Sequence, residues 1–168
     1  LQIYNGNGSN THYLHIENCR FVNTNDNVVE VWNDYSNITF LNCTFSGVST
    51  NPTVGDALLI GDTYNNIIID GCVFENKSRG LSISSTTESI YITNSTFRTN
   101  LYNGIWLGNA QQAVLDNCTF TDNGDGTSTG GAIFSYVSGG DYLEITNSTF
   151  TDNQGSDGGA LHVRDIDS

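Results

Sequence analysis

The chain has 168 residues with 5 Lys and Arg against 18 Asp and Glu, and its formal net charge of −13 makes nucleic acid and anionic membranes unfavourable partners. This length fits one domain, which we place at residues 1–168. Eighteen Gly, one Pro and no Met exclude a helical composition and indicate a β-rich chain, and no apolar run is long enough to insert into a membrane as a helix.

A strand with one buried face is predicted at the start of each of six repeated units. One Phe marks each unit, at spacings of 23 to 30 residues: Phe21, Phe45, Phe74, Phe97, Phe120 and Phe150. The residues seven and five positions before each Phe are apolar in every unit, from Leu14 and Ile16 to Leu143 and Ile145, and the residue between them varies. Because successive side chains of a strand point to opposite faces, this alternation predicts a half-buried strand.

A sharp bend is predicted between this strand and the Phe. The third residue before each Phe is one that tolerates left-handed backbone: Asn18, Asn42, Gly71, Asn94, Asn117 and Asn147. We expect these Asn side chains to turn inward and form a hydrogen-bonded ladder. The next position holds a small residue in every unit: Cys19, Cys43, Cys72, Ser95, Cys118 and Ser148. We expect the cysteines to pack as small buried residues, with one disulfide as the alternative.

A second strand is predicted after a loop rich in Gly, Asn and Asp. These strands cover 28–32, 57–60, 80–83, 104–107, 132–135 and 160–163. Stacked coils require the same chemistry at the same place in every unit, because each residue lies on its equivalent. The predicted fold is therefore an all-β, right-handed, single-stranded parallel β-helix (a solenoid) of about six coils. It is expected to be a piece of a longer solenoid or a segment that stacks end to end.

Two stretches carry a resemblance to known β-helix repeats. Asn-Cys/Ser-Thr-Phe-Thr-Asp-Asn followed by Gly-Gly-Ala-Ile/Leu occurs at 117–133 and again at 147–161. This pattern resembles the Phe-x-x-Asn and Gly-Gly-Ala-Ile repeats of polymorphic outer-membrane proteins and the adhesin-like surface β-helices of methanogenic archaea. The looser units are similar to the pectate-lyase-like repeat. The resemblance implies a secreted or cell-surface location and leaves the activity open, since this fold hosts many functions.

An aromatic stripe is predicted on the outward side of the second strands. Alternation places two rows there: Glu30, Leu59, Ser82, Trp106, Phe134 and His162, and beside them Trp32, Gly61, Ser84, Gly108, Tyr136 and Arg164. Exposed aromatic rings stack well on sugar rings. The candidate glycan-binding residues are Trp32, Trp106, Phe134, Tyr136, Glu30, Asp34 and Asp62. Two alternatives are that loops or a neighbouring domain cover the stripe, or that a register slip of one residue buries Phe134 and His162.

Calcium and N-linked glycans are further candidates. Two Asp- and Asn-rich loops offer oxygen ligands, namely Asp122, Asp125, Asp152 and Asp157, although the same residues are ordinary in turns. The fold requires no cofactor. Of seven glycosylation sequons, those at Asn42, Asn94, Asn117 and Asn147 are explained by the inward ladder, which leaves Asn7, Asn37 and Asn76 as candidates.

The predicted function is that of an extracellular or cell-surface structural and adhesive β-helix module, which associates end to end or continues into flanking domains. The alternative is a polysaccharide-binding or polysaccharide-cleaving module that uses the aromatic stripe. No catalytic residue is assigned, because the acidic and basic residues form no constellation of known chemistry.

Overall fold

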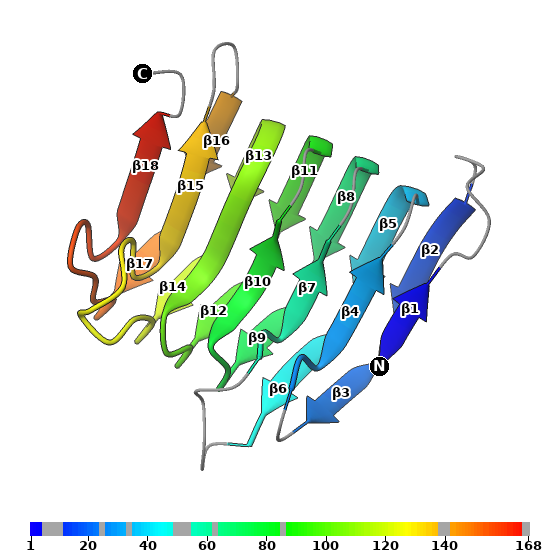
Figure 1. Ribbon diagram of the computed structural model, residues 1–168, viewed down its shortest axis with the longest axis horizontal. Coiled ribbons are helices and arrows are strands. Elements are labelled where there is room, and N and C mark those ends of the chain that lie inside the picture. Colours follow the sequence, from blue (N-terminus) through cyan, green and yellow to red (C-terminus); the bar gives the residue numbers. More distant parts are fainter. Residues whose placement is uncertain are drawn as a thin grey trace.

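In a computed structural model, the protein is a stack of coils built from three parallel sheets (Figure 1). The structure describes residues 1–4, 12–23, 26–32, 35–48, 55–61, 64–84, 87–137 and 142–165. These residues form strands and connecting turns without a helix, and every strand pair in them is parallel. The predicted all-β parallel β-helix is confirmed.

Each coil contributes one strand to each sheet, and β13 (Asn103–Asp116) runs through two of them. Sheet A contains β1 (Gln2–Tyr4), β4 (Val29–Trp32), β7 (Leu58–Ile60), β10 (Arg79–Ile83), β13, β15 (Ile133–Val137) and β18 (Leu161–Asp165). Sheet B contains β2 (His12–Glu17), β5 (Tyr35–Leu41), β8 (Tyr64–Asp70), β11 (Thr87–Thr93), β13 and β16 (Tyr142–Thr146). Sheet C contains β3 (Arg20–Asn23), β6 (Thr44–Gly47), β9 (Val73–Glu75), β12 (Thr96–Arg98), β14 (Thr119–Thr121) and β17 (Thr149–Thr151). Figure 1 shows the coils side by side, from the N-terminus to the C-terminus.

The six phenylalanines form one continuous file inside the tube. Phe21, Phe45, Phe74, Phe97, Phe120 and Phe150 pair in register along sheet C. Their ring centroids lie 4.7 to 5.4 Å apart and the rings are stacked. The four middle rings are fully buried, so the predicted core file is confirmed.

The predicted bend is confirmed for the backbone and wrong for the side chains. The five bend asparagines have φ between 50° and 56°, and Gly71 has φ 63°. Their side chains are exposed, because a left-handed residue at the corner between sheets B and C directs its Cβ away from the tube. Asn117 Nδ2 donates to Asn94 Oδ1 at 2.7 Å on the outer surface. An inward ladder therefore does not account for these four sequons; Asn37 and Asn76 are half-buried, and Asn7 lies outside the described residues.

The buried asparagine ladder lies instead three residues after the Phe file, in the Phe-x-x-Asn repeat. Asn100 Nδ2 donates to Asn123 Oδ1 and Asn123 Nδ2 donates to Asn153 Oδ1, both at 2.9 Å. Each Nδ2 also donates to the carbonyl oxygen of the Phe one coil earlier. Lys77 holds the same position in the preceding coil, is 1% exposed, and reaches the backbone oxygen of Asp26 at 2.7 Å with its Nζ.

The four cysteines are free, and all but the half-buried Cys19 are buried. Cysteine and serine are interchangeable in this file because both accept a backbone N–H: Cys43 N donates to Cys72 Sγ, and Cys72 N donates to Ser95 Oγ. The prediction of small packing residues is confirmed over the disulfide alternative. Burial raises the pKa of Cys72 to about 12 and that of Cys118 to about 11, from an ordinary value of 9.0.

Alkaline pH is expected to destabilise the fold through these two thiols. Since their folded pKa values are raised, the unfolded thiols ionise first. The stability that the two neutral thiols contribute to the folded protein is therefore complete below pH 9.0. It declines as pH rises toward their folded pKa values of about 11 and about 12. At about pH 10, ionisation of each thiol in the unfolded state should lower the free energy of unfolding by about 1.4 kcal/mol. Urea unfolding at about pH 8 and about pH 10 should show the double variant Cys72→Ser/Cys118→Ser losing about 3 kcal/mol less than the parent. Equal losses in both proteins would contradict the assignment.

Candidate functional site

The outward face of sheet A carries the predicted aromatic stripe. Glu30, Leu59, Ser82, Trp106, Phe134 and His162 pair in one register across six strands. Ile133 is fully buried in the core, which excludes the slipped register for β15. A register shift between Leu107 and Asn109 places Tyr136 opposite Asn109, at the edge of the stripe.

Phe134 faces outward but is covered by its neighbours. Its ring lies 4.8 Å from the Tyr136 ring, 5.4 Å from the His162 ring and 6.4 Å from the Trp106 ring, and the residue is 5% exposed. It therefore supports the rings around it, while the half-buried Trp106 and Tyr136 offer ring surface to a ligand.

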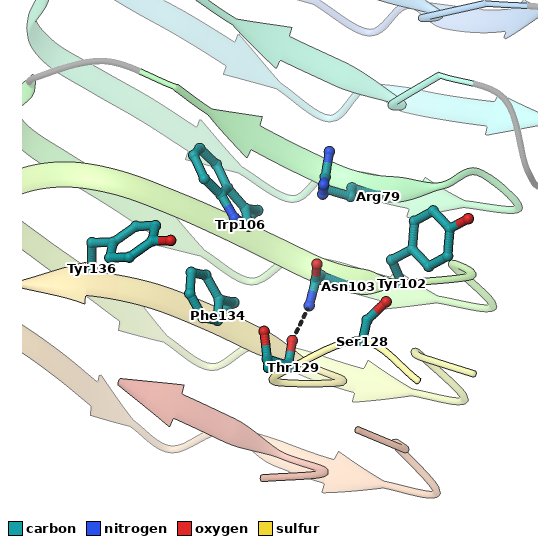
Figure 2. Close-up of a pocket in the computed structure, with 8 residues that line it drawn as sticks. All are labelled: Arg79, Tyr102, Asn103, Trp106, Ser128, Thr129, Phe134 and Tyr136. Atoms are coloured by element: carbon teal, nitrogen blue, oxygen red, sulfur yellow. Dashed lines mark hydrogen bonds between the residues drawn. The ribbon is translucent and has the colours of Figure 1, made fainter. Parts of the chain in front are cut away.

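Two hollows adjoin on this face and share Arg79 and Trp106. The first has a volume of about 390 Å³ and is lined by Trp32, Asp56, Leu59, Arg79, Ser82, Ser84 and Trp106. The second has a volume of about 310 Å³ and is lined by Arg79, Tyr102, Asn103, Trp106, Ser128, Thr129, Phe134 and Tyr136. Figure 2 shows the second hollow, with Trp106, Phe134 and Tyr136 grouped at one side and Tyr102 at the other. Asn103 Nδ2 donates to the backbone oxygen of Thr129 at 2.8 Å and ties the wall to the next coil (Figure 2).

Trp32 is held at the far end of the first hollow by two contacts. A Cβ built on Gly61 would lie 2.2 Å from the Trp32 ring, so the indole lies directly on the glycine backbone. Its Nε1 donates to Glu30 Oε2 at 3.3 Å. Glu30 is 9% exposed and also accepts hydrogen bonds from Gln2 and Asn27. Glu30 thus positions the indole, and its oxygens are engaged within the protein.

Arg79 and Asp56 form a charged pair where the two hollows meet. Arg79 Nη1 lies 3.7 Å from Asp56 Oδ1, and the guanidinium carbon lies 5.8 Å from the centre of the Trp106 ring. Asp56 is 6% exposed, and burial raises its pKa, although the charge of Arg79 opposes this shift. Arg79 Nε is buried and has no hydrogen-bond partner among the described residues. Neither residue could be predicted from alternation, because Asp56 precedes β7 and Arg79 begins β10, outside the alternating rows.

Of the other predicted ligands, those that the structure describes do not line the two hollows. Asp34 and Asp62 lie outside the described residues. Asp125 Oδ1 accepts hydrogen bonds from the backbone and hydroxyl of Thr127, as an ordinary turn residue does. Asp122 and Asp152 have left-handed backbone, each with φ 54°, and Asp157 is exposed. Within the described ranges, no group of three or more His, Cys, Asp or Glu could hold a metal ion.

Comparison with known proteins identifies the fold family. The sequence matches the family described as right handed beta helix region over residues 2–150. No curated protein and no solved structure matches the chain. In the part of the chain that the structure describes, no helix is long and apolar enough to cross a membrane. The match covers most of the chain and agrees with the stacked parallel sheets, and the chain therefore belongs to the right-handed β-helix family.

Proposed function

We propose that this β-helix is an extracellular adhesive module that binds carbohydrate on the outward face of sheet A. The observation that carries the proposal is the pair of adjoining hollows that share Trp106 and Arg79. Sites for small polar ligands combine apolar ring surface with a few fixed polar groups, and this face has both.

The ring surface comes from Trp32, Trp106 and Tyr136, each of which is half-buried. A half-buried indole keeps one face for a ligand while its other contacts fix its orientation, which lowers the entropic cost of binding. The polar groups are Asp56, Arg79 and Ser82, and they offer both donors and acceptors of the kind that sugar hydroxyls need. The resemblance to adhesin-like β-helix repeats supports the same proposal.

Replacement of Trp106 by alanine is expected to weaken glycan binding by about tenfold or more, because the ring borders both hollows. Gly61→Ala should weaken binding several-fold although it removes no aromatic ring, because its methyl group would displace Trp32. The measurement is a glycan array followed by titration calorimetry on the glycans that bind.

Tyr91→Ala is the matched control for these variants. Tyr91 is an exposed aromatic residue on sheet B and is 37% exposed, so its removal should leave binding unchanged. Equal binding by Trp106→Ala and the parent would contradict the proposal, as would the absence of binding to every glycan on the array. Release of reducing or unsaturated sugars by the parent would show that the face cleaves glycans as well as binding them.

A further inference from the structure

The two hollows follow one another along the axis of the β-helix. Trp32 lies on β4, Arg79 on β10, Trp106 on β13 and Tyr136 on β15. The lining residues therefore extend across five neighbouring strands of sheet A, in the order β4, β7, β10, β13 and β15. Neighbouring strands are about 4.8 Å apart, so the lined path is about 19 Å long. One pyranose unit of an extended glycan spans roughly one inter-strand step, and the path therefore fits about four units.

The centre of this path is electrically balanced. Of the described residues that line the two hollows, Arg79 and Asp56 carry charge, and they face each other at 3.7 Å. The guanidinium lies near the Trp106 ring and borders both hollows, and the Arg79 side chain is 37% exposed, so its terminal nitrogens can donate to a ligand oxygen. A chain of net charge −13 repels polyanions at long range, and Asp56 repels a carboxylate at close range.

We propose that the ligand is an uncharged, extended glycan of about four pyranose units, and that the Arg79–Asp56 pair selects against acidic sugars at its centre. This inference rests on the proposed function. Arg79 donates to hydroxyl or ring oxygens while Asp56 accepts from hydroxyls and cancels the charge that would attract a carboxylate. The pair is thus a specificity determinant, and its removal should change which glycan binds.

The test is titration calorimetry with cello-, laminari- and manno-oligosaccharides of two to about six units, and with oligogalacturonides of the same lengths. The parent protein should bind one of the neutral series, with affinity that rises up to about four units and then stays constant. Asp56→Asn leaves Arg79 uncompensated and should strengthen oligogalacturonide binding by about tenfold. Glu88→Gln is the matched control, because it removes one negative charge at an exposed position on sheet B.

The outcomes separate this inference from the proposed function. Tighter binding of oligogalacturonides than of all neutral series by the parent would overturn the inference while leaving glycan binding intact. So would affinity that reaches its full value with two units. Equal effects of Asp56→Asn and Glu88→Gln would show that net charge, and not the pair, sets the preference. Failure of all four series to bind would count against the proposed function itself.

Discussion

Replacing Phe97 with alanine is expected to lower the free energy of unfolding by about 3–5 kcal/mol. Phe97 is fully buried, and its ring stacks on Phe74 at 4.7 Å and on Phe120 at 5.0 Å. Alanine removes both stacking contacts and leaves a cavity in the middle of the file. The fixed coil spacing keeps the neighbouring backbones from closing that cavity, so the full cost should appear. Urea unfolding followed by far-ultraviolet circular dichroism measures it.

Phe150→Ala is the matched control for this prediction. Among the described residues, the Phe150 ring stacks only on Phe120, at 4.8 Å, and Phe150 is half-buried, so the same truncation there should cost about half as much. Equal losses at the two positions would mean that stacking in the file does not set the stability. That outcome would also challenge the view that each coil is stabilised by both of its neighbours.

The fold could be predicted because stacking imposes one chemical requirement on each column of residues. Phe45, Phe74 and Phe97 share one environment, and Ile38, Ile67 and Ile90 share another. Residues at equivalent positions of the sequence repeat therefore lie next to each other in neighbouring coils. The same logic placed Trp106 opposite Phe134 on the outward face. Alternation along a strand fixes which face a side chain takes, and these predictions needed nothing more.

The central part of the candidate site could not be predicted in this way. Asp56 precedes a strand and Arg79 begins one, so neither belongs to a row that alternation defines, and their meeting depends on how the loops close. The contacts of Glu30 with Gln2 and Asn27 could not be predicted either, because they come from segments that no repeat links. Both cases concern contacts between loops and strand ends.

The asparagine ladder was misplaced because two columns of asparagine compete for the same role in the sequence. Asn94 and Asn117 occur at the bend, whereas Asn100 and Asn123 follow the Phe by three residues. Left-handed backbone explains the first column without any buried hydrogen bond. In the second column, Asn100 and Asn123 do not have left-handed backbone, and their side-chain amides form hydrogen bonds inside the tube.

Asn123→Ala is therefore expected to be far more damaging than a change at the bend. Asn123 is fully buried; its Nδ2 donates to Phe97 O and Asn153 Oδ1, and its Oδ1 accepts from the backbone and side chain of Asn100. Alanine leaves several buried partners unpaired at a cost of about 1–3 kcal/mol each, so a loss of at least about 3 kcal/mol is expected in urea unfolding.

Asn117→Gly supplies the comparison that decides between the two ladders. Its side chain is exposed and its backbone is left-handed, which glycine adopts readily, and Gly71 already occupies this column two coils earlier. The expected change is within about 0.5 kcal/mol, since an exposed hydrogen bond to Asn94 exchanges with water at little cost. If Asn117→Gly instead proved as costly as Asn123→Ala, the outer column would be a structural ladder after all. The burial of Asn123 argues against that result, because only a buried amide has no water to replace a lost partner.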